Sequence, residues 1–399
     1  MKKYLSLKYL TSVCFLAFIG FMLVYNARPA FYVAYHQLEN IRSGSGFSKA
    51  QAEYEYNDSL PGKSFYVSFN GGFQRLMGIR SVNERYKLDN GHLTYVVPQM
   101  DTTAMAENTV AFRDALAELD IPFGYISTPF KIDPQDKQLP PSIEDYANEN
   151  ADQFLSVLEE NDVPTLDLRK LEKEQSLDHY SLYFITDHHW KPETGFWAYT
   201  QIVSWLESLD ADFAVDPALT DAQNYTFTVY EDVFFGSNGW RVGALYSEMD
   251  DFTVITPNFE TSLHFQVPSA GINRQGTYEE TLLFLDILNQ NMGRTQENRM
   301  YGTYLYQDEA QEFIYNHSQQ QALQVQSKPK KLVILKDSNG LVVVPYLGLS
   351  YDEVCFMDLR LFNGDFLAFL QEYQPDMVLA MYNPGAFEEH NANMFQFIR

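Results

Sequence analysis

Cysteine is almost missing from this chain, which has two cysteines among its 399 residues. Cys14 lies in an apolar stretch near the N-terminus and Cys355 lies in a second apolar run, so we expect no disulfide framework inside the fold. Metal clusters held by thiolates are excluded as well, because they need several cysteine ligands close together.

Positive charge is also scarce. The chain has 28 Lys and Arg residues against 53 Asp and Glu residues, which gives a formal net charge of −25. Such a surface repels a phosphate backbone, and nucleic acid is therefore excluded as a partner. Hydrophobic residues make up 45% of the chain and charged residues 20%, so the bulk of it should fold, and the length predicts about two to three structural units.

Long apolar runs are limited to one. Lys2, Lys3 and Lys8 precede residues 9–24, an uncharged run of about the minimum length for one membrane-crossing helix. Residues 1–30 are therefore predicted to form an N-terminal membrane anchor or signal segment. An uncleaved anchor is favoured because the run lacks a clear cleavage site; a cleaved signal peptide and a buried core helix are the alternatives. The basic start predicts a single-pass protein of the cell membrane with its remainder extracytoplasmic, or a secreted protein if the segment is cleaved.

The rest of the chain divides into segments that differ in their pattern of apolar and polar residues. Residues 31–60 contain Ser-Gly-Ser-Gly and a polar stretch, which predicts a stalk or linker. Short apolar runs alternate with helical patterns over 61–206 and again over 331–399, which is typical of an α/β fold with a parallel sheet. This regularity is lost over 207–330, which we interpret as an insertion. The predicted fold is a doubly wound parallel sheet with a mixed or β-rich insertion, preceded by one N-terminal membrane helix.

The expected elements follow the apolar runs and their periodicity. Strands are expected at 64–69, 93–97, 123–127, 165–168, 182–186, 331–335, 353–357 and 377–381. Helices are expected at 103–119, at 150–161, from Pro192 onward and at 365–373. The Val-rich run at 341–347 fits a strand or a helix, and a short helix is favoured because parallel neighbours need a crossover.

Ser338 follows the strand expected at 331–335, in a small polar turn. Its hydroxyl is thus predicted at the carboxyl edge of the sheet, where open α/β sheets bind ligands. Free N–H groups of a following helix would stabilise an oxyanion there. The alternative is a serine that only caps a helix. The Gly-x-Ser-x-Gly motif typical of α/β-hydrolases is absent.

The sequence Asp187-His188-His189-Trp190 follows another apolar run. In extended backbone, residues i and i+2 share a face, which would pair Asp187 with His189 and turn His188 away, toward packing or substrate. An Asp in this place fixes the tautomer of a histidine that serves as a general base. The alternatives are a helix-entry cluster of buried polar groups and a zinc or manganese site, although adjacent histidines seldom suit one ion.

Two more polar residues emerge at the predicted sheet edge. The Asn383 amide is a candidate donor to an oxyanion, and an Asn-Pro-Gly turn is the alternative. Arg360 lies beside Asp358, where it would hold an anionic group or, as we favour, form a structural salt bridge.

Three segments together resemble the DHHW protein family, a relative of alginate O-acetyltransferases within the SGNH hydrolase superfamily. They are Tyr-Phe-Ile-Thr-Asp-His-His-Trp at 183–190, Phe-Gly-Ser at 235–237 and Lys-Asp-Ser at 336–338. The resemblance implies an SGNH-hydrolase-like fold and a triad of Ser338, His189 and Asp187. Asn339 and Gly340 depart from the family pattern, in which a bulkier residue is common after the serine.

The resemblance also implies a function. It points to an extracytoplasmic serine-dependent O-acyltransferase, with acetyl as the favoured group, that modifies a cell-envelope or exported polysaccharide through an acyl-serine intermediate. The acyl donor would come through a multi-spanning membrane O-acyltransferase, and neither a cofactor nor a metal is expected. Alternatives are an SGNH-type carbohydrate esterase and a non-catalytic carbohydrate-binding or assembly protein. The candidates for oxyanion or substrate contacts are Asn339, Asn383, His188, Trp190 and Arg360.

Overall fold

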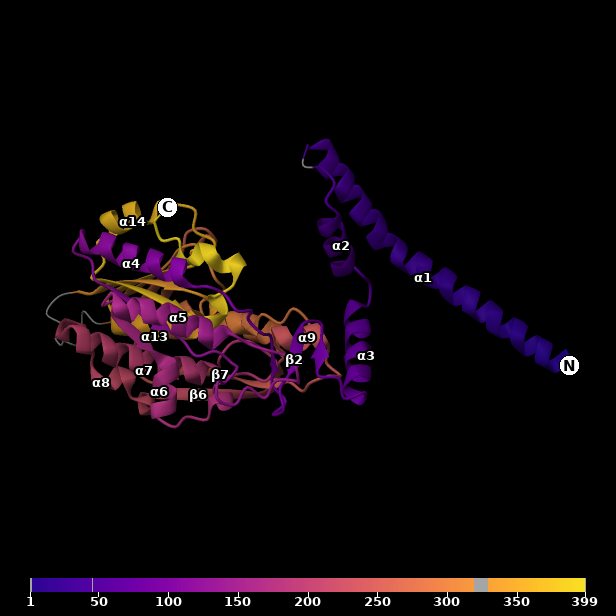
Figure 1. Cartoon of the computed structure of the whole chain (residues 1–399), viewed down its shortest axis with the longest axis horizontal. Helices are drawn as coiled ribbons and strands as arrows, with labels where there is room; N and C mark the ends of the chain where they lie inside the picture. Colours follow the sequence, from indigo (N-terminus) through magenta and orange to yellow (C-terminus); the bar gives the residue numbers. More distant parts are fainter. Residues whose placement is uncertain (1, 45, 319–328, 399) are drawn as a thin grey trace. The chain divides into compact units, whose positions relative to one another are not determined.

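The structure of the protein, a computed structural model, describes residues 2–44, 46–318 and 329–398. The chain divides into two units, Met1–Asn70 and Gly71–Arg399. Figure 1 traces the chain from indigo at the N-terminus to yellow at the C-terminus.

The first unit is helical. Helix α1 (Lys2–Arg42) contains the predicted apolar run, and its part from Tyr9 to Arg42 is long and apolar enough to cross a membrane. Helix α2 (Lys49–Asp58) begins at Ser48, whose hydroxyl accepts a hydrogen bond from the N–H of Gln51.

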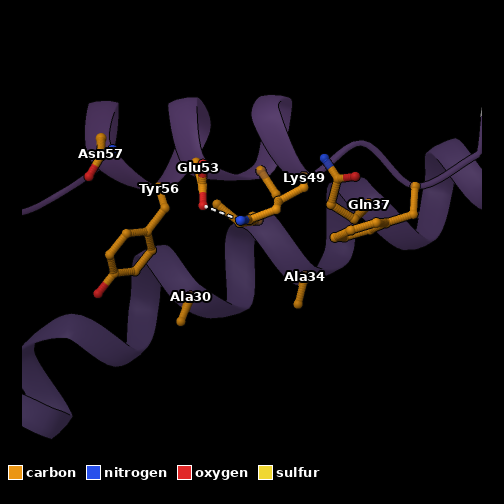
Figure 2. Close-up of a pocket in the computed structure, with 10 residues that line it drawn as sticks. Ala30, Ala34, Gln37, Lys49, Glu53, Tyr56 and Asn57 are labelled. Atoms are coloured by element: carbon orange, nitrogen blue, oxygen red, sulfur yellow. Dashed lines mark ion pairs between the residues drawn. The ribbon is translucent and has the colours of Figure 1, made fainter.

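Small residues on α1 leave a hollow beside α2. Figure 2 shows Ala30 and Ala34 of α1 near Tyr56 of α2 and near the ion pair of Lys49 and Glu53, whose charged atoms are 3.5 Å apart. The hollow has a volume of about 400 Å³.

Helices occupy most of 31–60, the segment expected to be a stalk or linker, because α1 continues past Pro29 to Arg42; Ser45 lies outside the described residues. The strand expected at 64–69 is wrong, since these residues lie in helix α3 (Lys63–Leu76). Phe65, Phe69 and Phe73 recur every four residues there, a spacing that places side chains on one face of a helix and equally on one face of a strand, so this pattern does not distinguish the two.

The second unit is built on an eight-stranded sheet with the order β5-β4-β13-β11-β12-β10-β8-β9. The first five strands are parallel and the last three antiparallel, so the predicted α/β fold with a parallel sheet is confirmed. Their bounds are β4 Phe123–Ser127, β5 Thr165–Asp167, β8 Leu263–Val267, β9 Ile272–Gly276, β10 Glu312–Asn316, β11 Lys331–Lys336, β12 Glu353–Met357 and β13 Met377–Tyr382.

Helices cover both faces of this sheet. Leu332 and Ile334 of β11 pack in one apolar cluster with α7 (Pro192–Leu209) and α13 (Val344–Ser350). Val333 and Leu335 pack in another with α4 (Thr103–Ala117), α5 (Ala147–Glu160) and α14 (Phe366–Tyr373). Figure 1 shows α4 and α14 on one side of the sheet and α7 on the other. Burial on both faces explains why residues 332–335 of β11 form a continuous apolar run between two lysines.

Part of the predicted insertion belongs to the central sheet. Strand β10 pairs with β12, and β8 and β9 continue outward from it, so β12 is not an exposed edge. The insertion also forms the hairpin of β6 (Tyr225–Phe234) and β7 (Asp250–Pro257). Residues 319–328 of the insertion lie outside the described residues.

Two predicted strands are shorter or absent. The run at 93–97 contributes only β3 (Leu93–Thr94), which pairs with β2 (Arg85–Lys87), itself paired with β1 (Ser81–Val82). The run at 182–186 is a series of bends with an isolated bridge from Tyr183 to Trp190. The remaining helices are α6 Leu168–Glu174, α8 Pro217–Thr220, α9 Ser237–Val242, α10 Tyr278–Leu282 and α11 Leu285–Asn291.

Gly195 sets how closely α7 approaches the segment after Ser338. A Cβ there would overlap the carbonyl oxygen and side chain of Val342. We expect Gly195→Ala to lower the free energy of unfolding by about 1–3 kcal/mol, the usual cost of an overpacked core. Gly302→Ala is the control, because its Cβ would meet only Cδ1 of Ile287 at 3.7 Å. Equal losses in urea titrations of the two variants would contradict this account.

Candidate active site

Ser338 lies directly after β11, in a 3₁₀-helix that spans Ser338–Val342. Asp337 fixes this turn: its carboxylate accepts hydrogen bonds from the N–H of Asn339 at 2.9 Å and from the N–H of Asn383 at 2.7 Å. Since Asn383 follows β13, one carboxylate joins the ends of two neighbouring parallel strands. The structure thus places Ser338 at the carboxyl edge of the sheet.

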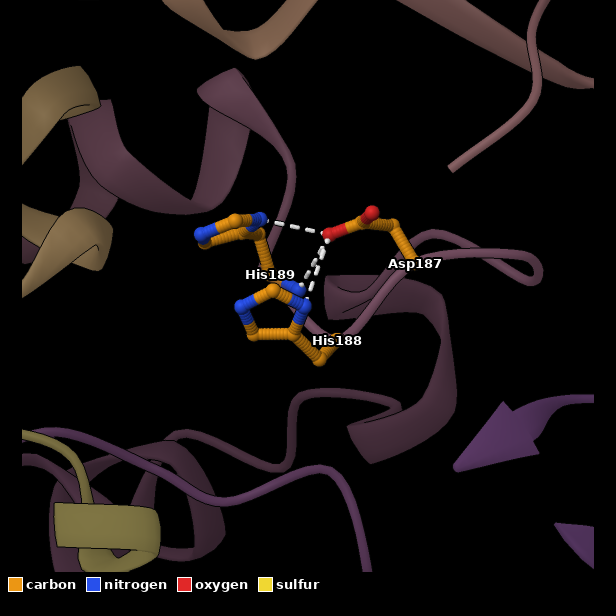
Figure 3. Close-up of side chains that lie close together, drawn as sticks. All are labelled: Asp187, His188 and His189. Atoms are coloured by element: carbon orange, nitrogen blue, oxygen red, sulfur yellow. Dashed lines mark hydrogen bonds and ion pairs between the residues drawn. The ribbon is translucent and has the colours of Figure 1, made fainter. Parts of the chain in front are cut away.

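Asp187 and His189 lie in the bent segment and not in a strand. The Asp187 carboxylate accepts the backbone N–H of His189 at 2.9 Å, and the same oxygen lies 2.5 Å from Nδ1 of its ring. The pairing of residues i and i+2 expected from extended backbone is therefore made by a tight turn. Figure 3 shows both contacts converging on Asp187.

The His189 ring reaches Ser338 on its other side. Nε2 of His189 lies 2.7 Å from the Ser338 hydroxyl oxygen, within hydrogen-bond distance, although 149 residues separate them. The structure therefore brings Asp187, His189 and Ser338 into one continuous hydrogen-bonded chain, in the arrangement that serine acyl-transfer sites use.

Asp187 is buried and held ionised. Its second oxygen accepts the backbone N–H of Ser237 at 2.5 Å, at the start of α9, and a Cβ at Gly236 would overlap the Asp187 side chain. Burial by itself would raise the pKa of Asp187. The imidazoles of His188 and His189 and the hydrogen bonds from His189 outweigh burial and hold this pKa well below its usual range.

His188 does not turn away from the site, which corrects the prediction. Its Nδ1 lies 2.8 Å from the Ser237 hydroxyl and 3.4 Å from the Asp187 carboxylate, and its ring centroid is 3.8 Å from that of His189. Burial and then the neighbouring His189 lower the pKa of His188 to about 3, so its ring is neutral at physiological pH.

Asp187, His188 and His189 also form the group of possible metal ligands, with ligand atoms within 4.8 Å of one another. Two ligands about 2.0–2.1 Å from a tetrahedral zinc lie roughly 3.3 Å apart. The separation of 2.5 Å between Asp187 and Nδ1 of His189 is instead that of a hydrogen bond. The geometry therefore fits proton transfer better than metal coordination.

The predicted oxyanion donors are mostly engaged elsewhere. The Asn383 amide donates to the carbonyl of Pro129 at 2.5 Å, and its oxygen accepts the N–H of Gly385 at 2.9 Å, which are the contacts of the Asn-Pro-Gly turn considered as the alternative. The N–H of Asn339 donates to Asp337. The Ser338 N–H has no hydrogen-bond partner within the described ranges.

The other two candidates, Trp190 and Arg360, bind residues that adjoin the site. The indole N–H of Trp190 donates to the carbonyl of Asn339 at 3.0 Å, which ties the histidine segment to the serine turn. Arg360 forms the favoured salt bridge with Asp358 at 2.6 Å and also lies 3.6 Å from Asp308. Asp308 in turn pairs at 2.6 Å with Lys336, which is completely buried under the site.

A cleft of about 630 Å³ opens over Ser338, His189 and Asp187. Its outer wall comes from residues 287–308, which include Arg294 and Arg299 at the exposed rim. Tyr301 from this wall stacks on the His189 ring, with centroids 4.0 Å apart and planes inclined by 13°. No local pattern in the sequence links Tyr301 to His189, because 112 positions separate the two residues.

Comparisons with known proteins show what the chain resembles. Residues 91–229 match a family model described as SGNH hydrolase-like domain, acetyltransferase AlgX. None of the curated proteins matches the chain.

Solved structures show the same fold. PatB1 of Bacillus cereus, solved with a sulfonyl adduct, is 20% identical with a TM-score of 0.61, over 77% of this chain and 95% of that one. A DHHW family protein from Eubacterium siraeum is 17% identical with a TM-score of 0.58, over 79% of this chain and 96% of that one. The resemblance predicted from the sequence is thus confirmed: residues 91–229 are similar to the SGNH hydrolase-like domain of acetyltransferase AlgX, and the fold is that of the solved relatives.

Proposed function

We propose that this chain is a serine-dependent O-acyltransferase that acetylates a cell-envelope or exported polysaccharide outside the cytoplasmic membrane. The observation that carries the proposal is the hydrogen-bonded chain from Asp187 through His189 to the Ser338 hydroxyl. The match of residues 91–229 to an acetyltransferase family supports the choice of acyl chemistry.

The reaction proceeds in two halves. In the first, Nε2 of His189 takes the Ser338 proton as the serine oxygen bonds to the acyl carbonyl carbon, and the proton then passes to the departing donor group. In the second, His189 takes the proton of an acceptor hydroxyl, whose oxygen attacks the acyl-serine. The Ser338 oxygen leaves with the proton, so the enzyme is restored. Asp187 stabilises the imidazolium in both halves.

The oxyanion of each tetrahedral intermediate needs donors at the serine turn. The Ser338 N–H, at the start of the 3₁₀-helix, is the donor that we assign. One such donor contributes about 3 kcal/mol to the stability of the transition state.

The acceptor would bind in the cleft, whose rim carries the polar side chains of Gln290, Arg294, Glu297 and Arg299. A hydroxyl-rich glycan suits such a lining. An anchored α1 would keep Ser338 near a membrane-borne donor and raise its effective concentration, which fits a multi-spanning membrane O-acyltransferase as the partner that supplies the acyl group.

The second candidate is a carbohydrate esterase, in which water takes the place of the acceptor hydroxyl. The exposed rim of the cleft favours it, since solvent reaches the cleft over Ser338. Both functions use the same acyl-serine.

Ser338→Ala should abolish acyl-enzyme chemistry. We expect full-length protein in detergent to hydrolyse p-nitrophenyl acetate and the variant to lose about 10³-fold or more in kcat/KM, because the nucleophile is removed. The measurement is the release of p-nitrophenolate.

Ser237→Ala is the matched control, because the Ser237 hydroxyl lies beside the other histidine, His188. This variant should keep most of the activity, and a sulfonyl fluoride should modify the peptide that contains Ser338 in mass spectra. Loss of turnover in Ser237→Ala alone, with labelling of Ser237, would move the nucleophile to the His188 side.

Gly236→Ala should disable the site while leaving the serine in place. The added Cβ would overlap Asp187 and push its carboxylate away from His189. We expect kcat to fall by about 10²-fold, the cost of misplacing a catalytic group by about 1 Å. Gly302→Ala in the cleft wall is the control, and an unchanged kcat in Gly236→Ala would show that Asp187 is not needed where it lies.

Transfer and hydrolysis can be separated by partition of the acyl-enzyme. With p-nitrophenyl acetate as donor, added oligosaccharides should be acetylated and free acetate should fall correspondingly, measured together by mass spectrometry. Acetate release that is unaffected by every acceptor tried would favour the esterase.

A further inference from the structure

We propose that Lys131 is a positioning residue for the site: its buried ammonium group and the carboxylate of Asp250 hold residues 185–187 between them, so that Asp187 meets His189. This inference rests on the proposed function. It concerns a lysine that lies 56 residues before Asp187 and is absent from the motifs that suggested the family.

Lys131 uses all three of its N–H groups on backbone carbonyls. Its side chain extends from the loop after β4 with only 1% of the residue exposed. Nζ donates to the carbonyls of Leu93 at 2.6 Å, Ile185 at 3.0 Å and Asp187 at 2.7 Å. Two of these three acceptors belong to the segment that carries the proposed catalytic carboxylate.

The Asp250 carboxylate binds backbone N–H groups of the same segment. One carboxylate oxygen accepts the N–H of Ile185 at 2.5 Å, and the other accepts the N–H of Thr186 at 2.8 Å together with the Thr186 hydroxyl. The remaining carbonyl, that of Thr186, accepts the N–H of Gly239. We call Lys131 and Asp250, which together bind residues 185–187, the clamp. Asp250 is the first residue of β7, so the β6–β7 hairpin supplies this half of the clamp.

The clamp replaces secondary structure. Residues 185–187 lie in neither a helix nor a strand, yet buried backbone polar groups must be paired. A methionine at position 131 would fill a similar volume but leave the carbonyl of Asp187 without its donor. It would also remove one of the two donors to the carbonyls of Leu93 and Ile185, which keep Asn238 and the Leu93 N–H. The segment would then shift toward water, and the Asp187 carboxylate would move with it.

The Lys131 side chain is expected to lose its proton near neutral pH. Burial lowers the pKa of Lys131 to about 7, against the opposing attraction of Asp250 and Asp187 and with a smaller repulsion from Lys191. The other titratable groups that face it are His92, His179 and His188. A neutral amine has two N–H groups for three carbonyls, so the clamp loses one hydrogen bond above about pH 7.

Activity and stability should therefore respond to this titration in opposite directions. The unfolded chain keeps the lysine proton up to its ordinary pKa of about 10.4, whereas the folded chain releases it near 7. Between these values the unfolded state binds more protons, so this group makes the fold more stable as pH rises. The clamp weakens over the same pH range. A purely structural role of Lys131 would not lower kcat in this range.

The test is the pH profile of kcat for p-nitrophenyl acetate with the full chain. We expect kcat of the wild-type protein to fall above about pH 7 while its unfolding midpoint in urea does not fall. Lys131→Met should lower kcat by about 10²-fold with little change in KM, because Lys131 does not line the cleft. Lys131→Arg stays protonated, so it should recover part of kcat and lose the alkaline fall.

Two further variants make the result decisive. Lys137→Met is the matched control, since Lys137 binds Asp145 and Glu149 outside the site, and it should keep the wild-type profile. If Lys131→Met does not fold, Asp250→Asn tests the inference in its place. This variant should lower kcat and leave KM unchanged. Folded Lys131→Met or Asp250→Asn with wild-type kcat and profile would overturn the inference, while loss of turnover in Ser338→Ala would leave the proposed function intact. Wild-type turnover in Ser338→Ala would instead overturn the proposed function.

Discussion

The hydrogen bond between His189 and Ser338 joins two parts of the chain that lie 149 positions apart in the sequence, and contacts on both sides hold its two atoms at 2.7 Å. The serine side is set by the sheet, because Asp337 ties the ends of β11 and β13 and so fixes the turn that carries the hydroxyl. The histidine side has no regular element and depends on side chains that bind its backbone. Trp190 links the two sides through the carbonyl of Asn339.

Buried charge is concentrated around this contact, in a chain that has few cations. Lys336 and Arg360 neutralise Asp308 and Asp358 below the cleft, and Lys131 lies behind the histidine segment. Burying ions costs free energy unless they are paired and hydrogen-bonded, and replacing such groups with apolar ones is often neutral or stabilising. Their presence here is therefore better explained by positioning of the site than by stability of the fold.

Much of the fold could be predicted from the sequence because its parallel strands are buried on both faces. Such strands are short apolar runs bounded by polar turns, which is why 123–127, 331–335, 353–357 and 377–381 were recognisable and why Ser338 could be placed at the sheet edge. The segments at 64–69 and 182–186 are apolar for other reasons, a helical face and a buried bend. Lys131, Asp250 and Tyr301 escaped prediction because each acts on residues more than 50 positions away. The turn considered for Asn383 could be anticipated from its Asn-Pro-Gly sequence, whereas the bond from its amide to the distant carbonyl of Pro129 could not.

Tyr301 and His188 both lie within about one ring thickness of the His189 imidazole, so the ring has little room to rotate or to meet bulk water. A base stacked in this way presents mainly its Nε2 edge to the cleft. In the proposed reaction, an arriving alcohol must therefore approach along that edge to be activated. Stacking thereby fixes the orientation of the imidazole ring, which the hydrogen bond at Nδ1 alone would not fix.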